Sequence, residues 1–387
     1  MHIHICIISD QLLANYIPVL VEKPDLVLIQ STALMAQRGL TARFEGLLSA
    51  EQFEFTTHFN MPDTRMSVIH AYARNLYVHI GTAYPNARVT LNITGGNKLM
   101  SLGMLDIFGA VGCRVIYADT ANNCIEYLSP STYDEPIPAV LDIPQYLRAY
   151  GAVFTEIRSD SPAWQECAMR RKTTAVQLAR LSIDSTRSGL ISVLNGMASS
   201  ALAVDHNSLE APEQQFTRPL EYVWHDILQH MDVLNIVHFR ANQYLTFLDV
   251  ERTEFVNGLW LEEFAYHTAI DIGLGDDGDV GCGIKLRWLN SNVTNELDLL
   301  IVHRNRLLMM ECKTMKLEHK NVVANEIVYK TSSIGEQLTG LFGTKVLLSA
   351  LPLPEPALQR AHSKQIKVVY PWELRDFLMS WMEGISH

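Results

Sequence analysis

The stretch NELDLLIVHRNRLLMMECK, residues 295–313, decides the fold of the C-terminal part of the chain. Its two apolar runs, LLIV and LLMM, flank a short polar segment, which is typical of two strands joined by a tight turn. We place the centre of the turn between Arg304 and Asn305. This register puts Asp298 directly opposite Glu311 on the neighbouring strand.

The hairpin gathers charged side chains on one face. Cross-strand partners share a face, and so do residues two apart on one strand, so Glu296, Asp298, Glu311 and Lys313 should converge. Cys312 should point to the opposite, apolar side. We expect Glu296 to be the cross-strand partner of Lys313. The alternative is an ordinary amphipathic hairpin whose charges lie in solvent.

Opposed carboxylates destabilise a strand pair, and a divalent cation would remove that conflict. Two carboxylates, water and a backbone carbonyl suit Mg²⁺ or Mn²⁺, which prefer oxygen ligands. The expected metal ligands are Asp298, Glu311 and Cys312, the last through its carbonyl. Lys313 beside the cation could position or deprotonate an attacking water, or stabilise charge on the phosphorus centre.

These residues resemble the PD-(D/E)xK nuclease superfamily, in which an acidic residue ends one strand and E-x-K follows on the next. The resemblance covers about 130 residues. It implies a helical glutamate, for which NGLWLEEF offers Glu262, with Glu263 as the rival. It also implies a helper on the following helix, matched by Gln337. The implied catalytic residues are Asp298, Glu311, Lys313, Glu262 and Gln337.

Composition is that of a globular protein of two or three domains, with 387 residues, 48% hydrophobic and 19% charged. We see no membrane span and no signal peptide. Six scattered cysteines without a CxxC pair predict a reducing, cytoplasmic location. The net charge of -11 means that a nucleic acid would need a local basic patch or a bridging cation.

Residues 1–150 alternate apolar runs with amphipathic stretches, which predicts a Rossmann-like α/β domain with a largely parallel sheet. One helix is expected at 64–83 and a hairpin around 121–123. The expected strands are 2–8, 25–30, 53–59, 88–94 and 113–119. Ligands bind such sheets beyond the carboxyl ends of the strands, here at 9–11, 31–32 and 94–98.

The segment NITGGNKLM, residues 92–100, leads from a strand through two glycines into a helix. Backbone N–H groups at the start of a helix, close approach through glycine and the charge of Lys98 predict an anion site. A tight turn that simply needs glycine is the alternative. The segment matches neither GxxxxGK[ST] nor GxGxxG, so neither ATP hydrolysis nor a nicotinamide cofactor is expected.

A Rossmann-like domain with this turn, followed by a PD-(D/E)xK domain, resembles the CRISPR-associated Rossmann fold (CARF) nucleases of antiviral defence. The resemblance implies a homodimer that binds a cyclic oligoadenylate, most often cyclic tetra-adenylate, and then cuts single-stranded DNA or RNA or nicks duplex DNA. The implied ligand-binding residues are Thr94, Gly95, Gly96, Asn97, Lys98, Ser9, Asp10 and Gln11.

Between these domains, residues 151–250 carry helical patterns at 162–184, 187–203 and 219–234, then two strands around 241–242. We interpret this part as a helical connector. A winged-helix-like module is the alternative, and its basic face would be formed by Arg170, Arg171, Lys172, Arg180 and Arg187.

Residues 251–387 predict a restriction-endonuclease-like α/β domain. The order is a helix at 252–270, strands at 283–289, 297–303 and 307–314, a helix at 332–342, strand KVLLSA, a short helix, strand QIKVVY and a helix starting at Pro371. Two other functions stay open: a ligand-responsive transcription regulator, and a constitutive restriction or repair nuclease.

Overall fold

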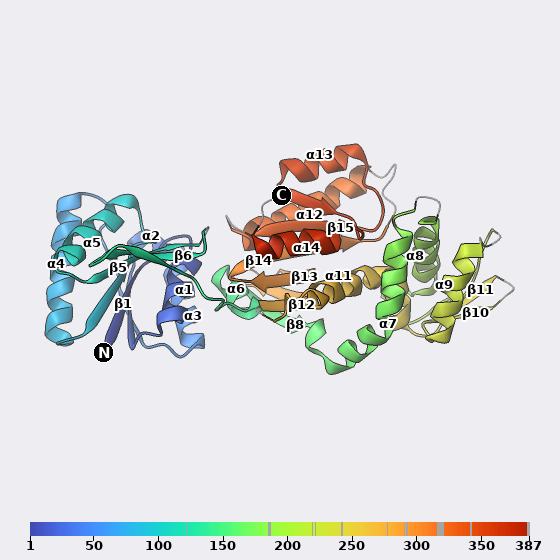
Figure 1. Ribbon diagram of the computed structural model, residues 1–387, viewed down its shortest axis with the longest axis horizontal. Helices are drawn as coiled ribbons and strands as arrows, with labels where there is room; N and C mark the ends of the chain where they lie inside the picture. The colour runs from blue at the N-terminus through green and yellow to red at the C-terminus, as the bar shows by residue number, and fades with distance from the viewer. Residues whose placement is uncertain are drawn as a thin grey trace. The chain divides into compact units, whose positions relative to one another are not determined.

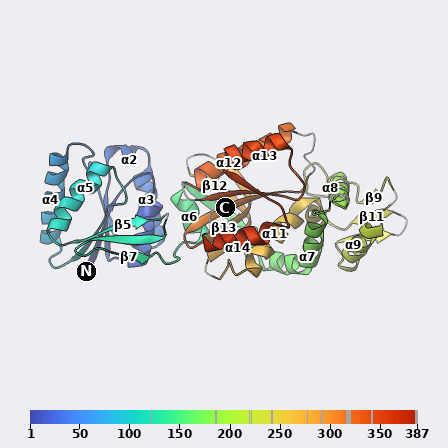
Figure 2. The same cartoon turned by 45° about the horizontal axis from the view of Figure 1, so that its top comes forward.

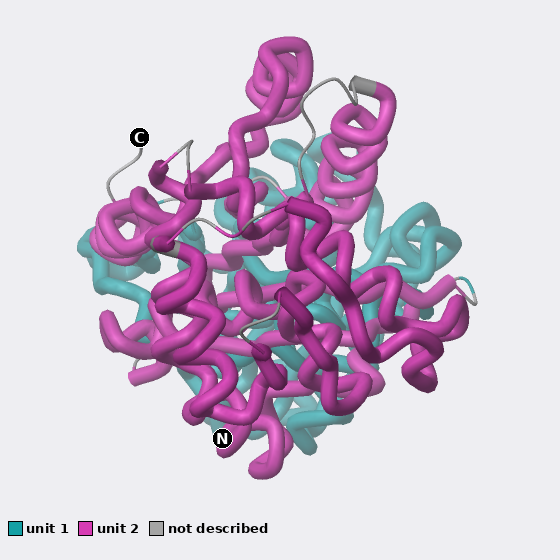
Figure 3. Tube along the Cα trace, turned by 90° about the vertical axis from the view of Figure 1, so that its right-hand side faces the viewer, with its two compact units in different colours: residues 1–153, 288–291 teal, residues 154–287, 292–387 magenta. Residues whose placement is uncertain are grey.

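The computed structural model describes residues 1–120, 122–184, 187–218, 220, 222–240, 243–276, 278–289, 291, 293–315, 321–340 and 343–384. The chain forms two compact units, which Figure 3 colours separately. Unit 1 contains residues 1–153 and 288–291, and unit 2 contains residues 154–287 and 292–387. No described helix combines the length and the apolar character needed to cross a membrane.

Unit 1 is built on a seven-stranded sheet in the order β3-β2-β1-β4-β5-β6-β7. The first five strands in this order run parallel, and the last two pair antiparallel. The strands are β1 (His2–Ile7), β2 (Leu26–Gln30), β3 (Phe55–His58), β4 (Arg88–Asn92), β5 (Arg114–Asp119), β6 (Cys124–Ser129) and β7 (Tyr133–Pro136). The predicted Rossmann-like sheet is therefore confirmed.

Helices cover both faces of this sheet, which is why its central strands are buried along their length (Figure 1). Every residue of β1 and β2 is buried. Helices α4 (Met66–Ala83) and α5 (Lys98–Ala110) lie on one face, and α1 (Leu13–Glu22) and α3 (Leu40–Ala50) on the other (Figures 1 and 2).

Three short elements of unit 1 were not predicted. All four residues of β7 are exposed, so no apolar alternation marks the strand. The short α6 (Ile143–Ala149) begins at a capping box formed by Asp142 and Gln145. The helix α2 (Ala33–Gln37) has no buried residue. The expected hairpin turn is described except at Ala121, which lies outside the described residues.

Unit 2 is built on a six-stranded sheet in the order β16-β15-β14-β13-β12-β8. Strands β12, β13 and β14 pair antiparallel, and β14, β15 and β16 pair parallel. The strands are β8 (Ala152–Ile157), β12 (Gly278–Trp288), β13 (Thr294–His303), β14 (Arg306–Lys313), β15 (Thr344–Ser349) and β16 (Ile366–Val369).

The segment 151–250, expected as a connector, shares a core with the nuclease part. It supplies α7 (Pro162–Leu181), α8 (Gly189–Ala201), α9 (Tyr222–Val233) and a small sheet of β9 (Glu213–Gln215), β10 (Val237–Arg240) and β11 (Tyr244–Phe247). One apolar cluster runs from α7 to α14 (Leu374–Glu383). The expected turn at 241–242 lies outside the described residues.

Two of the five residues considered for the basic face of a winged helix are held by carboxylates within unit 2. Arg171 is buried and pairs with Glu263 at 2.6 Å and with Glu251 at 2.9 Å. Lys172 pairs with Asp271 at 2.6 Å. The other three, Arg170, Arg180 and Arg187, are exposed.

Three helix boundaries differ from the predictions. The single helix expected at 252–270 is instead divided into three parts, which are α10 (Val250–Glu254), a π-helical turn (Phe255–Leu259) and α11 (Trp260–Asp271). The helix is interrupted at Gly258, whose φ is 156°. The helix expected at 332–342 is α12 (Asn321–Leu338). The last helix, α14, begins at Leu374, after the predicted start at Pro371. The short α13 (Glu355–Ser363) is where it was expected.

Candidate active site and ligand loop

The β13–β14 hairpin has the predicted register. Leu299 pairs with Met310 and His303 with Arg306. Arg304 and Asn305 form the two-residue turn, with φ angles of 48° and 62°. Positive φ at both positions is the geometry of a type I′ turn, which suits the twist of a hairpin. The register therefore carries Asp298 and Glu311 to the same level of the sheet.

Lys313 ties the two carboxylates together. Its ammonium Nζ lies 2.8 Å from Glu311 Oε1 and 3.7 Å from Asp298 Oδ2. It also donates a hydrogen bond to the Cys312 carbonyl at 2.9 Å. The Asp298 carboxylate accepts a hydrogen bond from the Cys312 backbone N–H at 2.6 Å. Asp298, Glu311 and Lys313 thus form one face, as the hairpin register predicts.

Burial makes this face electrostatically unusual. Burial, together with the charge of Glu311, raises the pKa of Asp298 to about 6. Burial lowers the pKa of Lys313, but the carboxylates of Asp298 and Glu311 outweigh it, and the net shift is upward. Lys313 therefore stays protonated at neutral pH and acts here as a hydrogen-bond donor and positive charge.

Glu262 and Glu263, which the sequence left as rivals, have different surroundings. Both are buried on α11. Glu263 is held by Arg171, whereas burial and the negative charge of Asp298 raise the pKa of Glu262 well above its ordinary value. Glu262 lines the same cavity as Cys312 and Lys313, so it lies near the end of the hairpin.

The expected pairing of Glu296 with Lys313 is wrong. Glu296 instead pairs with Arg158, whose Nη2 lies 2.7 Å from Glu296 Oε1, and Arg158 Nη1 lies 3.5 Å from Glu262 Oε2. Gly283, with φ 62°, makes room for this guanidinium, because a Cβ there would come within 2.7 Å of Arg158 Nε. No short motif marks Arg158, which lies 104 residues before Glu262.

The residue of α12 that lies at the face is Lys330 rather than Gln337. Lys330 Nζ is 3.3 Å from Glu311 Oε1. Gln337 is exposed seven residues later, roughly 10 Å further along the helix axis. Because the helix was expected to begin at 332, the sequence offered no reason to place Lys330 on it.

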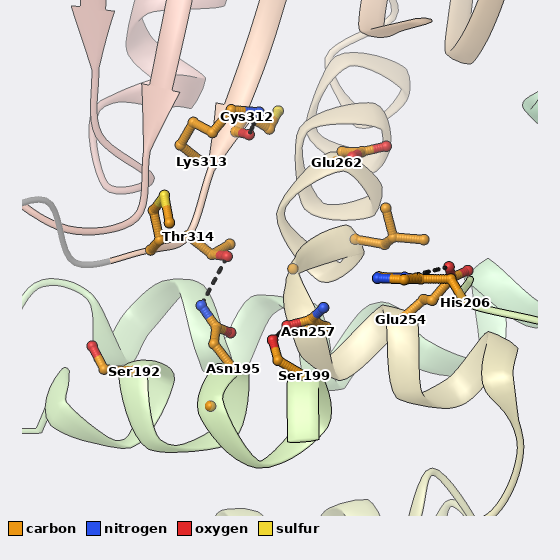
Figure 4. A pocket seen from close by; sticks show the side chains of 14 residues that line it. Ser192, Asn195, Ser199, His206, Glu254, Asn257, Glu262, Cys312, Lys313 and Thr314 are labelled. Atoms are coloured by element: carbon orange, nitrogen blue, oxygen red, sulfur yellow. Dashed lines mark hydrogen bonds and ion pairs between the residues drawn. The ribbon is translucent and has the colours of Figure 1, made fainter. Parts of the chain in front are cut away.

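A cavity of about 680 Å³ opens beside this face (Figure 4). Glu262, Lys313 and the neighbouring Thr314 lie on one side of it. The opposite side is α8, so the middle part of the chain contributes directly to the candidate active site.

The donor set fits a hard divalent cation. Asp298 and Glu311 offer carboxylate oxygens and Cys312 offers its carbonyl. The Cys312 thiol lies in the apolar core, and burial raises its pKa, so it offers no thiolate. Within the described parts of the chain, no three side chains of this face form a compact ligand group. Two carboxylates, a carbonyl and water therefore suit a divalent cation that prefers oxygen ligands.

In unit 1, hydrogen bonds and close packing hold the loop between β4 and α5 in place. The Thr94 hydroxyl donates to Asn92 Oδ1 at 2.6 Å and accepts from the Ala118 N–H at 2.6 Å. Asn97 caps α5 by accepting from the Met100 N–H at 3.0 Å. Gly95 packs so closely on Ile7 that a Cβ would lie 1.8 Å from its carbonyl oxygen.

The loops after β1 and β4 lie at the same edge, because the two strands are parallel neighbours. This is the point where the strand order reverses, the usual ligand position in such sheets. Gly96 has φ 75°, and Lys98 is exposed. Asp10 pairs with Arg38 at 2.7 Å, a cation that the sequence did not single out. Ser9 and Gln11 are partly exposed beside Asp10.

Together, the sheet and the hairpin define a sensor-type Rossmann domain joined to an endonuclease domain. Family models match both halves: "Card1 CARF domain" matches residues 3–146, and "Card1-like, endonuclease domain" matches residues 249–384. The chain is therefore a CARF-domain protein with a C-terminal Card1-like endonuclease domain. The predicted family and the predicted nuclease domain are confirmed.

Solved structures share the fold over the whole chain. Can2 from Sulfobacillus thermosulfidooxidans, in complex with cyclic tetra-adenylate, is 23% identical, with a TM-score of 0.77 over 98% of this chain and 97% of its own. A Vibrio cholerae protein is 20% identical, with a TM-score of 0.82 over 99% and 98%. A type III CRISPR defence DNA nuclease activated by cyclic oligoadenylate is 15% identical, with a TM-score of 0.54 over 90% and 45%. A comparison with curated proteins found no match.

Proposed function

We propose that this protein is a divalent-metal-dependent endonuclease, switched on by a cyclic oligoadenylate, that cleaves single-stranded nucleic acid or nicks duplex DNA in CRISPR-linked defence. The observation that carries the proposal is the partly buried face of Asp298, Glu311 and Lys313 within the endonuclease domain. A sensor domain of the CARF family in the same chain supports control by a nucleotide.

The face is suited to phosphodiester hydrolysis. Asp298 and Glu311 would hold Mg²⁺ or Mn²⁺ with the Cys312 carbonyl. When bound, the cation supplies Lewis-acid polarisation of a phosphoryl oxygen and activation of water. Protonated Lys313 would stabilise the charge that develops at phosphorus. Glu262 would orient water from the α11 side, and Lys330 would hold Glu311.

For the activator, we propose the loop of Thr94, Gly95, Gly96, Asn97 and Lys98, with Ser9, Asp10 and Gln11 from the neighbouring strand end. The loop leads into the start of α5, where free backbone N–H groups favour phosphate. Cyclic tetra-adenylate is the activator expected, since Can2, which shares the fold, was solved with it. A two-fold homodimer would present two copies of the loop to a symmetric ring.

The test is a cleavage assay with the full-length protein and Mn²⁺, with and without cyclic tetra-adenylate. Its substrates are a supercoiled plasmid, single-stranded DNA and single-stranded RNA. We expect nicking or single-strand cleavage only with both metal and activator, and at least a roughly 100-fold loss in Glu311→Gln. Glu326→Gln, an exposed change on α12, is the matched control.

Two results would contradict the proposal. Intact substrates under every condition would argue against a nuclease, and equal activity in Glu311→Gln would remove the face from catalysis. Full activity without the nucleotide would instead identify a constitutive restriction or repair nuclease.

A further inference from the structure

The face formed by Asp298, Glu311 and Lys313 is called the catalytic face here. We infer that α8 and the neighbouring residue Trp372 form the path along which a single strand of nucleic acid leaves this catalytic face. This inference rests on the proposed nuclease function and specifies how the substrate is held. The path consists of two cavities that meet at Ser192, which lines both of them.

The first cavity presents neutral polar groups to the catalytic face. On the α8 side it is lined by Ser192, Asn195, Gly196 and Ser199, which recur at one helical face (Figure 4). Side chains of serine and asparagine commonly bond to the sugar and phosphate of nucleic acids. With a volume of about 680 Å³, the cavity has the size of a pocket for one small ligand. It therefore suits an unpaired nucleotide rather than a duplex.

Asn195 ties this wall to the end of the hairpin. Its Nδ2 donates to Thr314 Oγ1 at 3.0 Å, and Thr314 follows Lys313 in the chain. Both residues line the first cavity. The hydrogen bond therefore fixes the wall of α8 next to Lys313.

The second cavity, of about 620 Å³, continues on the other side of Ser192 and is largely apolar. Leu351, Leu353 and Pro354 line it together with Trp372. The indole of Trp372 is 40% exposed and stacks on Tyr370, with ring centroids 4.8 Å apart and an angle of 5° between the planes. An exposed aromatic ring held in a fixed orientation is a stacking platform for an unpaired base.

Neither feature depends on a positively charged surface. The wall of α8 offers neutral hydrogen-bonding groups opposite the carboxylate of Glu262, and stacking on Trp372 requires no positive charge. Both features favour unpaired bases, because a base within a duplex cannot reach a stacking platform. The path thus predicts a preference for single strands over intact duplex.

The decisive variant places an apolar side chain in the first cavity. A Cβ at Gly196 meets no atom within 4 Å, so the backbone leaves room for a side chain to start there, and Gly196→Leu also removes a flexible residue from the helix. Ser200→Leu, on the same helix but outside the cavity lining, is the matched control. In the Glu311→Gln background, with cyclic tetra-adenylate and Mn²⁺, fluorescence anisotropy of a labelled single-stranded oligonucleotide measures the Kd.

We expect Gly196→Leu to raise the Kd at least roughly 10-fold and Ser200→Leu to leave it within about 2-fold. Trp372→Ala should raise the Kd by about 5- to 100-fold, while Tyr222→Ala, at another exposed aromatic residue, should not. In the Glu311 wild-type background, Gly196→Leu should raise KM for single-stranded substrate.

An unchanged Kd and KM in Gly196→Leu and Trp372→Ala, with cleavage retained, would overturn the path but leave the nuclease. Absence of cleavage in the unsubstituted protein would overturn the proposed function instead, and the path with it. Equal melting temperatures of the variants exclude loss of folding as the cause of weaker binding.

Discussion

At the scale of single residues, Lys330 tests whether a residue of α12 assists the face of Asp298, Glu311 and Lys313. Its ammonium reaches Glu311 from α12, whereas Gln337, which the superfamily pattern suggested, is exposed further along the helix. We expect Lys330→Ala to lower the cleavage rate about 10-fold, because Glu311 loses a partner that holds its orientation.

Gln337→Ala is the matched control for Lys330→Ala, since both change a polar side chain of the same helix. It should leave the single-turnover cleavage rate within about 2-fold of the unsubstituted protein. A large loss in Gln337→Ala with none in Lys330→Ala would return the helper role to the glutamine.

A second prediction concerns Glu22 in unit 1, which joins His2, His4 and Arg114. His4 Nδ1 lies 2.8 Å from Glu22 Oε2, and Arg114 pairs with the other oxygen. Burial alone would raise the pKa of Glu22, but the hydrogen bonds of His2 and His4 and the charges of His4 and Arg114 hold it well below its ordinary value. The carboxylate thus stabilises the folded state above the unfolded pKa of roughly 4.3.

Glu22→Gln should therefore destabilise the protein by about 1–3 kcal/mol at pH 7, because the amide removes the negative charge beside Arg114 and replaces one acceptor oxygen with a donor. As pH falls below the unfolded pKa, the carboxylate of the unfolded chain is protonated first, so the stability difference should shrink. Urea unfolding at pH 7 and pH 3 measures both. A difference that is equal at the two pH values would show that Glu22 acts through packing rather than charge.

At the scale of elements, the β4–α5 loop depends on glycine at one point. A Cβ at Gly95 would overlap the Ile7 carbonyl oxygen at 1.8 Å, and a backbone atom cannot move aside cheaply. We expect Gly95→Ala to lower stability by about 1–3 kcal/mol and to weaken nucleotide binding. Gly46→Ala on α3, where a Cβ meets nothing within 4 Å, should be neutral or stabilising. Thermal unfolding and calorimetric titration of both variants test the difference.

The hairpin was predictable because its geometry follows from local rules. Alternation of faces along β13 and β14, with a turn at Arg304 and Asn305, leaves one register that buries the apolar runs. The start of α12 was not predictable in the same way. Its opening residues, NVVANEIV, contain several β-branched side chains, which weaken the helical signal. Lys330 was missed for this reason.

At the scale of the whole molecule, contacts between distant segments decide what sequence patterns cannot. Arg171 looked like part of a solvated basic face, but it pairs with Glu263, 92 residues later, inside one core. Likewise, α8 contacts the candidate active site through the hydrogen bond from Asn195 to Thr314, two residues that are 119 positions apart in the chain. Periodicity finds the helices, but it carries no information about which distant carboxylate a given arginine meets.

The division into two units, one with the ligand loop and one with the candidate active site, makes a further prediction possible. A nucleotide that binds only the folded sensor domain stabilises it, by about 2.7 kcal/mol at 100 times its Kd. Cyclic tetra-adenylate should therefore raise the melting temperature of the full-length protein equally in the wild type and in Glu311→Gln, whose change lies in unit 2. Lys98→Ala, at the start of α5, should lower the shift.

Light scattering on the same samples tests the proposed homodimer, which would have twice the 43.6 kDa mass of one chain. A ring that binds across a two-fold axis should saturate at one nucleotide per two chains. One nucleotide per chain would contradict binding across a two-fold axis. A shift that disappears in Glu311→Gln but survives in Lys98→Ala would place the ligand outside the β4–α5 loop. Because this readout needs no cleavage, it separates nucleotide sensing from the nuclease reaction.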